Sequence, residues 1–473
     1  MTKPPQNSES AAMMAGMPFM PVSDSMFLIG ETREHPFHVG GLQLFKPPVD
    51  AGPDYAEVFY EQLMSTTEVS SDFRKRPGQP LAVMGNLTWI VDDEVDWEYH
   101  VRRSALPRPA RVRELLTVTS RWHSSPLDRH RPLWEMHVVE GLSDGRLAVY
   151  TKMHHAVIDG VGALRMMMRS LSDDPDARDC QAVWAPAKRR AKSSIVSTTN
   201  TSAIDLVKGA AGAVRQVVSI PPGLLKYGRH ALSDPQLVKP LSAPHTMLNV
   251  SIGGARRFAA QTWSMARIKE AGKALGGTVN DVVLAMCGGA LRTYLEEQNA
   301  LPDKPLVAMC PVSIRAEGDQ NAGNSITALL ANLATDKPDP LERFSAIRDS
   351  VQAAKSVLSE MTPLQRMLVG ALNGAPVLTG AVPGLVDRTA PAFNVIISNV
   401  PGPRTDMFWN GFEMDGCYPA SIPIDGVALN ITCTSSGSSM HFGLTGCRTS
   451  VPHLQRILAH LEDALTQLEE SVA

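Results

Sequence analysis

The sequence predicts an α/β protein of two domains joined by a linker. At 473 residues the chain is longer than one hydrophobic core usually serves, which favours two domains of about 200 residues each. In both halves, short runs of β-branched and apolar residues alternate with segments of helical periodicity. A basic segment followed by a Ser/Thr-rich one separates the halves. We therefore expect domains over residues 1–184 and 246–473, with a linker over 185–245.

The first half carries three strand patterns and three helix patterns. Apolar, β-branched runs predict strands over residues 39–45, 136–139 and 147–153. Apolar residues at helical spacing predict helices over residues 55–66, 114–124 and 161–168. A turn is expected at residues 73–78 and a pair of strands within residues 81–91.

The linker candidate has two readings. Lys188-Arg189-Arg190-Ala191-Lys192 precedes a Ser/Thr-rich stretch, and apolar residues then recur at helical spacing over residues 204–218. This pattern fits a crossover helix packed on the body of the protein. It also fits an amphipathic helix whose basic flank attaches to an anionic membrane surface.

The second half repeats the alternation. Strands are predicted over residues 257–265, 306–315, 392–398, 427–434 and 440–445, the last two as a hairpin. Helices are predicted over residues 266–275, 282–298, 341–358 and 451–468. Residues 367–386 carry no charge over a length that could cross a bilayer, but they contain several Gly and Pro residues. We interpret them as a buried or pocket-lining segment.

Composition and motifs exclude several classes of function. The net charge of −3 and the absence of long basic blocks argue against nucleic-acid binding. Six scattered cysteines without a CxxC pair indicate reduced thiols in the cytoplasm, and the N-terminus lacks the pattern of a signal peptide. No Walker A loop or GxGxxG motif supports nucleotide chemistry. Gly141-Leu142-Ser143-Asp144-Gly145 has the GxSxG spacing of a serine nucleophile, but its place between two strands predicts a β-turn.

The motif HHxxxDG at residues 154–160 is the strongest functional signal. It lies where a strand ends and a helix begins, which is a common position for catalytic residues. An imidazole there can take a proton from an alcohol and return it to a leaving group. Asp159 is open to a second reading as a helix cap. Adjacent strand residues point to opposite faces, so His154 and His155 are not expected to share a metal ion.

This motif in its strand–turn–helix setting resembles the chloramphenicol acetyltransferase-like acyltransferases. Other segments narrow the resemblance to the bacterial wax ester synthase/acyl-CoA:diacylglycerol acyltransferases. They are residues 36–40 (PFHVG), 132–135 (PLWE), 280–282 (NDV), 311–315 (PVSIR) and 398–403 (SNVPGP). Phe37 stands where Met is expected. The resemblance implies two chloramphenicol acetyltransferase-like (CoA-dependent acyltransferase) domains, with the active site in a tunnel between them.

The same resemblance implies an O-acyltransferase that moves a fatty acyl group from acyl-CoA to a long-chain alcohol or to diacylglycerol. His155 is then the general base, with His154 beside it and Asp159 paired with Arg315. Acyl-CoA is a substrate, so no cofactor and no metal is expected. We therefore expect a cytoplasmic protein without a transmembrane helix, in peripheral contact with the membrane or with lipid inclusions.

Further residues are candidates for support of the site. Asn280 is a candidate donor to the oxyanion, with a helix cap as the alternative, and Asp281 follows it. Gly160 allows a close approach of substrate. Pocket-shaping roles, with simple packing or a turn as the alternative, are assigned to Pro132, Leu133, Trp134, Ser398 and Asn399.

Two other functions are open. One is a condensation-type acyltransferase whose donor is bound to a carrier protein, although the chain contains no carrier module. The other is a non-catalytic lipid-binding protein that keeps the scaffold. No activated Ser or Cys is evident, so direct transfer in a ternary complex is preferred to an acyl-enzyme.

Overall fold

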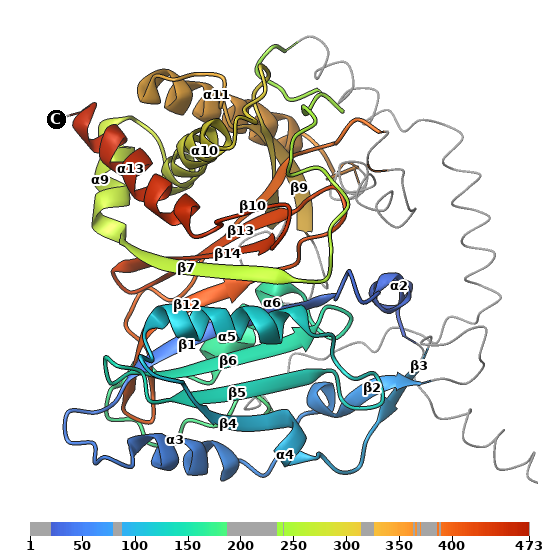
Figure 1. The fold of residues 1–473 in the computed structure, drawn as a ribbon, viewed down its shortest axis with the longest axis vertical. Helices are drawn as coiled ribbons and strands as arrows, with labels where there is room; N and C mark the ends of the chain where they lie inside the picture. The colour runs from blue at the N-terminus through green and yellow to red at the C-terminus, as the bar shows by residue number, and fades with distance from the viewer. Residues whose placement is uncertain are drawn as a thin grey trace, which may run out of the picture.

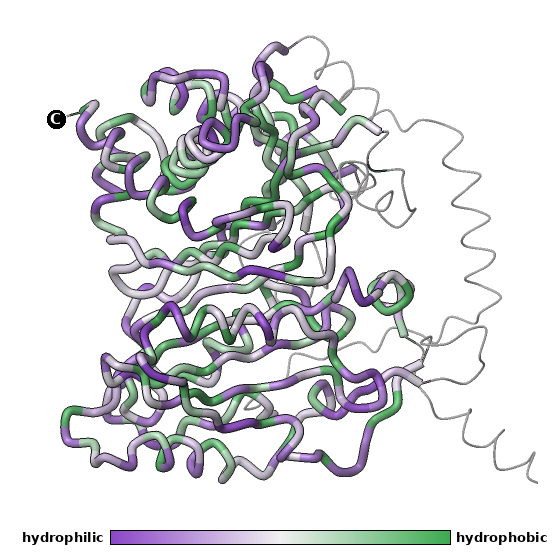
Figure 2. The backbone as a smooth tube through the Cα atoms, in the orientation of Figure 1, coloured by the Kyte–Doolittle hydropathy of each residue, from purple (hydrophilic) through white to green (hydrophobic). Residues whose placement is uncertain are grey.

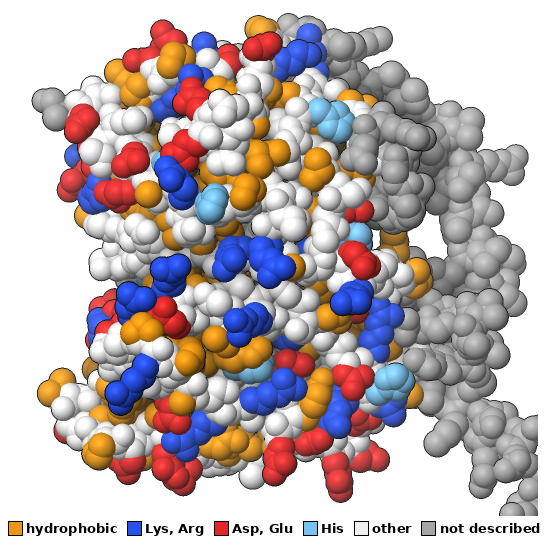
Figure 3. Space-filling model, viewed as in Figure 1, with side chains coloured by type: hydrophobic (Ala, Val, Ile, Leu, Met, Phe, Trp, Pro, Cys, Tyr) orange, Lys and Arg blue, Asp and Glu red, His pale blue; other side chains and the backbone are white. Residues whose placement is uncertain are grey.

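The structure, a computed structural model, confirms the α/β class. It describes residues 20–78, 88–186, 234–239, 241–313, 326–362, 365–366, 369, 386 and 389–472. Two six-stranded sheets form the centres of two lobes, one above the other in Figure 1. Hydrophobic residues concentrate in the strands and in the central helix of the upper lobe (Figure 2). On the face seen in Figure 3, acidic and basic side chains are interspersed.

The N-terminal lobe is built on a sheet with the strand order β11-β12-β1-β6-β5-β4. Its strands are β1 (His38–Lys46), β4 (Val101–Ala105), β5 (Trp134–Glu140), β6 (Leu147–His154), β11 (Phe408–Trp409) and β12 (Phe412–Ala420). Helix α5 (Val112–Ser124) packs on one face, while α3 (Tyr55–Met64) and α6 (Gly160–Arg169) pack on the other. Two short helices complete the lobe, α2 (Val22–Gly30) and α4 (Trp97–His100).

The C-terminal lobe has the strand order β7-β14-β13-β10-β8-β9. Its strands are β7 (Arg256–Ser264), β8 (Val307–Ser313), β9 (Ile326–Asn332), β10 (Val395–Val400), β13 (Leu429–Ser436) and β14 (Ser439–Cys447). Its helices are α9 (Met265–Ala274), α10 (Val279–Glu297), α11 (Pro340–Ser359) and α13 (Arg456–Glu470). Helix α10 is buried along most of its length and forms the centre of the core.

Two strands of the second half of the chain, β11 and β12, lie in the sheet of the first lobe. β12 pairs antiparallel with β1, and Gly40 lies opposite Ala420. Main-chain hydrogen bonds thus tie residues 412–420 into the N-terminal sheet. We predicted two domains that follow one another in the sequence. β11 and β12 belong to the second of these domains by sequence but to the first lobe in space.

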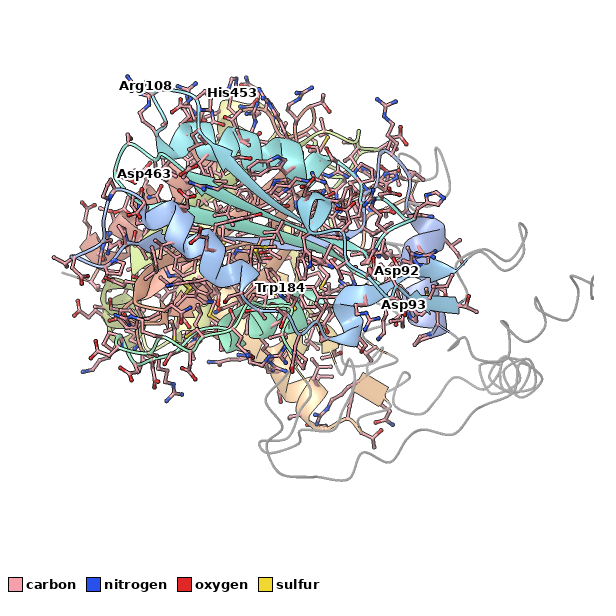
Figure 4. All side chains as sticks on the ribbon, turned by 90° about the horizontal axis from the view of Figure 1, so that it is seen from below. Asp92, Asp93, Arg108, Trp184, His453 and Asp463 are labelled. Carbon is pink, nitrogen blue, oxygen red and sulfur yellow. The ribbon has the colours of Figure 1, made fainter. Side chains whose placement is uncertain are left out.

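Several local predictions can be compared with the structure. The β-turn at residues 141–145 is confirmed, with Gly141 and Gly145 at positive φ between the antiparallel strands β5 and β6. The turn predicted at residues 73–78 is wrong in part. A 3-10 helix (Ser71–Arg74) leads into β2 (Lys75–Gly78), which pairs with β3 (Thr88–Val91). Asp92 and Asp93, labelled in Figure 4, follow β3.

Some predictions lie outside the described residues. They are the helix at 204–218 with its basic flank, the strand residues 81–87, Arg315, and all but Val369 and Val386 of the 367–386 segment. Both of those valines are buried. Among the described residues, no single helix is long and apolar enough to cross a membrane. The bent pair α9–α10, with an angle of 97°, meets that test by length and composition only.

Candidate active site

The HHxxxDG motif connects β6 to α6, as predicted. β6 ends at His154 and α6 begins at Gly160. The Asp159 carboxylate caps the helix, since its Oδ1 accepts the main-chain N–H of Gly162 at 2.6 Å. A Cβ on Gly160 would meet no atom within 4 Å, so space is open at this helix end. The cap is therefore one role of Asp159, and its predicted partner Arg315 lies outside the described residues.

His154 is enclosed by protein. The ring is fully buried, and its Nδ1 accepts the main-chain N–H of Ala156 at 3.0 Å. Because Nδ1 supplies a lone pair to this bond, the ring proton resides on Nε2. Nε2 lies 3.4 Å from Oε1 of Glu31. These contacts hold the ring of His154 in place, and its catalytic role stays a prediction.

His155 lies at the boundary of the buried core. Its main-chain N–H donates to the carbonyl of Phe37 at 2.8 Å, and its ring lies against that of Phe27, with centroids 4.2 Å apart and planes inclined by 32°. Burial lowers the pKa of His155 to about 4, against the opposing effect of the Asp159 charge. The imidazole is therefore neutral at physiological pH, as a general base must be.

Sequence reasoning missed the residues that surround this pair. Phe27 lies on α2, and Glu31 follows that helix. The Arg129 guanidinium donates to Oε2 of Glu31 from Nη2 at 2.9 Å and from Nε at 3.1 Å. Arg129 and Glu31 are 98 positions apart in the sequence, so no local pattern could have joined them.

The PLW residues divide between the site and the core. The carbonyl of Leu133 accepts the N–H of His154 at 3.0 Å, and its side chain belongs to the same cluster as Ala156 and Leu28. Trp134 is completely buried, and its Nε1–H donates to the carbonyl of Phe73 at 2.8 Å.

Trp134 is a core residue by its remaining contacts as well. Its ring stacks on that of His100 with a centroid distance of 4.5 Å and lies 5.8 Å from that of Trp184. Trp184, labelled in Figure 4, is also fully buried. Pro132, the residue before Leu133, is buried too.

The remaining candidates lie in the C-terminal lobe. Thr278 caps α10, and Oδ2 of Asp281 accepts the Thr278 N–H and hydroxyl, both at 2.8 Å. Asp281 therefore serves the cap, and the half-buried Asn280 is not needed for it. Ser398 and Asn399 lie on β10 beyond its last pairing with β8, so only β13 continues beside them.

The structure thus brings His154, His155, Asp159, Gly160 and Leu133 together around the end of β6. Within the described residues, no group of three or more His, Cys, Asp or Glu side chains could hold a metal ion. The tunnel between the lobes stays a prediction.

Comparisons with known proteins cover nearly the whole chain. The family model of the wax ester synthase/diacylglycerol acyltransferase catalytic domain matches residues 20–283, and that of the WS/DGAT C-terminal domain matches residues 322–469. A probable diacylglycerol O-acyltransferase of Mycobacterium tuberculosis is 51% identical over 458 residues, which cover 96% of this chain and 100% of that protein.

Solved structures give the same result. The wax ester synthase/diacylglycerol acyltransferase from Marinobacter aquaeolei VT8 is 39% identical, with a TM-score of 0.78 over 96% of this chain and 100% of that one. The first condensation domain of the CDA synthetase is 15% identical, with a TM-score of 0.57 over 97% of both chains. At that identity it shares the fold alone, which confirms the predicted fold class.

Proposed function

The chain belongs to the wax ester synthase/diacylglycerol acyltransferase family and is an acyltransferase, and on this premise we propose that it moves a fatty acyl group from acyl-CoA to a long-chain alcohol or to diacylglycerol. The products are a wax ester or triacylglycerol, together with free CoA. The observation that carries the proposal is a neutral imidazole, His155, at the end of β6 under the ring of Phe27.

The reaction starts with proton removal. A ring nitrogen of His155 accepts the hydroxyl proton while the alcohol oxygen attacks the carbonyl carbon of the thioester. The tetrahedral intermediate then collapses with cleavage of the C–S bond. The imidazolium returns its proton to the departing CoA thiolate, so the products are an ester and CoA–SH, and His155 is again neutral.

The intermediate carries a negative oxygen that needs hydrogen-bond donors already in place, each commonly worth ~3 kcal/mol. Asn280 is our candidate donor from the C-terminal lobe, because Thr278 and Asp281 complete the helix cap without it. Gly160 leaves room for the acyl carbonyl to approach the start of α6. The ion pair of Asp159 with Arg315 is proposed as architectural support.

Direct transfer without an acyl-enzyme is part of the proposal. A covalent route needs an activated nucleophile, and a thiol acts as its thiolate. Burial raises the pKa of Cys310 and of Cys417 to about 12, so neither is ionised at neutral pH. Cys447 has a pKa lowered to about 7 by Thr449 and Ser450 despite burial, but it lies at the end of β14 in the C-terminal lobe.

We place the protein in the cytoplasm, in peripheral contact with a membrane or with lipid inclusions. Its acceptors are hydrophobic, and each methylene buried in a binding site contributes about 0.8 kcal/mol, which also favours tolerance of varied chain lengths. Deletion of residues 188–192 should weaken flotation with anionic liposomes. Unchanged flotation would remove the basic run from this part of the proposal.

The deciding experiment measures ester and CoA formation together. Palmitoyl-CoA is supplied with hexadecanol or with diacylglycerol, and palmitoyl-carrier protein serves as the alternative donor. We expect both esters from the CoA donor, and His155→Ala should abolish both. His130→Ala, which changes an exposed histidine, is the control and should be fully active. Ester formation that persists in His155→Ala, or a requirement for the carrier-bound donor, would refute the proposal.

A further inference from the structure

A buried carboxylate lies behind the two histidines. The side chain of Glu31, which directly follows α2, is 4% exposed. A carboxylate in such a place is costly unless it is paired and hydrogen-bonded. Its partners therefore indicate why this residue is buried so close to the site.

The two carboxylate oxygens of Glu31 have different partners. Oε1 accepts the main-chain N–H of Phe37 at 3.0 Å and faces Nε2 of His154 at 3.4 Å. Oε2 accepts from Nη2 and Nε of Arg129 at 2.9 and 3.1 Å. Burial raises the pKa of Glu31, but the contacts with His154, Phe37 and Arg129 outweigh it and hold the pKa below its ordinary value.

Both contacts of Oε1 lead to His155. Phe37 donates its N–H to Glu31 and accepts the N–H of His155 at its carbonyl, at 2.8 Å. Nε2 of His154 lies 3.4 Å from Oε1 of Glu31 without hydrogen-bond geometry, while Nδ1 of the same ring accepts the N–H of Ala156. One carboxylate thus contacts both the ring of His154 and the main chain that bonds to His155.

α2 carries a second contact with the same ring. Phe27 lies four positions before Glu31 and packs on the imidazole of His155. An anchor at Glu31 therefore fixes the end of the helix that covers the base.

We propose that Glu31, oriented by Arg129, is a positioning residue for acyl transfer, because its charge lies against the ring of His154 and its hydrogen bond with Phe37 holds the main chain around His155. This inference rests on the proposed function, in which His155 is the base. Neither Glu31 nor Arg129 contacts substrate in this role. Both act through the geometry of the HHxxxDG turn.

The test is a set of variants with kcat and KM measured separately. Glu31→Leu removes both acceptor oxygens, and we expect kcat to fall by about 100-fold with KM for palmitoyl-CoA unchanged, since small misplacements of a catalytic group have effects of this size. Glu31→Gln keeps an oxygen for Phe37 and His154, so kcat should fall by only about tenfold. Adding Arg129→Gln to Glu31→Gln should cost nothing further, because Arg129 acts through Glu31.

The matched control is Glu140→Gln. Glu140, on β5 of the same lobe, also accepts two hydrogen bonds from one arginine, from Nε and Nη2 of Arg103 on β4, both at 3.1 Å. The kcat of Glu140→Gln should equal that of the wild type. Circular dichroism measures the folded fraction of each variant, and kcat is calculated per folded molecule. If Glu31→Leu does not fold, the inference is tested by Glu31→Gln with and without Arg129→Gln.

Two results would overturn the inference. One is a wild-type kcat in the folded Glu31 variants, and the other is full additivity of Glu31→Gln and Arg129→Gln. Failure of the proposed function is a separate outcome, in which the wild type makes no ester or His155→Ala keeps its activity.

Discussion

The environment of His155 predicts an unusual pH dependence. Burial, to which the ring of Phe27 contributes, lowers the pKa of this imidazole from its ordinary value of 6.5 to about 4. The acid limb of kcat/KM reports the base of the free enzyme. We expect kcat/KM to be nearly constant between pH 8 and pH 5. Phe27→Ala admits water to the ring and should return the limb towards pH 6.5.

The magnitude follows from the two pKa values. At pH 5 a histidine of pKa 6.5 is only ~3% neutral, whereas one of pKa 4 is ~90% neutral. The ratio of kcat/KM at pH 8 to that at pH 5 should therefore be close to one in the wild type. It should rise towards ~30 in Phe27→Ala. Phe27→Leu keeps an apolar cover and should behave like the wild type.

The assay must suit acidic solution. Ester formation is followed by mass spectrometry rather than by thiolate reagents. A palmitoyl-pantetheine donor repeats the series, because the 3′-phosphate of CoA also titrates near pH 6.

The fold must also persist at pH 5. Burial lowers the pKa of His123 and of His441 to about 4 as well, below that of the unfolded chain. The unfolded state therefore binds more protons, and stability falls as the pH drops below about 6.5. Fluorescence at each pH identifies the folded range. A wild-type limb near pH 6.5 within that range, or a Phe27→Ala profile equal to the wild type, would refute the reasoning.

Three further substitutions test individual assignments. Gly160→Ala should leave the melting temperature unchanged, since Gly160 is not at positive φ and the new methyl meets no protein atom, but it should lower kcat/KM if substrate approaches there. Trp134→Phe loses the bond to Phe73 and should cost about 1–3 kcal/mol in urea unfolding without a change in either KM, whereas a raised KM would assign Trp134 to the pocket. Gly443→Ala places a methyl 1.9 Å from the carbonyl of Pro419, where β14 meets β12, and should destabilise by about 3 kcal/mol in the same assay.

Local patterns predicted most elements of the fold but not all of its pairing. Strands such as β6 and β8 are rich in apolar and β-branched residues, and helices such as α11 repeat apolar residues at regular spacing, so each is visible within a short window. β12 carries Asp415, Gly416 and Pro419, which weaken any strand pattern. Its place beside β1 depends on residues nearly the whole chain away.

In the candidate site, too, the local motif could be predicted and the long-range contacts could not. The HHxxxDG turn is local and was predicted together with its flanking strand and helix. The assignment of Trp134 to the pocket used a motif, and a motif does not tell on which face of a strand a side chain lies. Phe27 and Arg129 could not be predicted, because their importance comes from contacts with residues far away in the sequence.

The position of β12 in the N-terminal sheet also bears on how substrate reaches His155. A separation of the lobes would break the main-chain hydrogen bonds between β12 and β1 or displace the chain between β10 and β12. α2 carries no such constraint, since it is nine residues long and belongs to neither sheet. Its Met26 and Ile29 are 48% and 65% exposed, while its neighbour Phe27 covers the imidazole. A displacement of α2 would uncover the proposed base without breaking sheet hydrogen bonds, whereas Glu31 holds the end of this helix to Phe37 and Arg129.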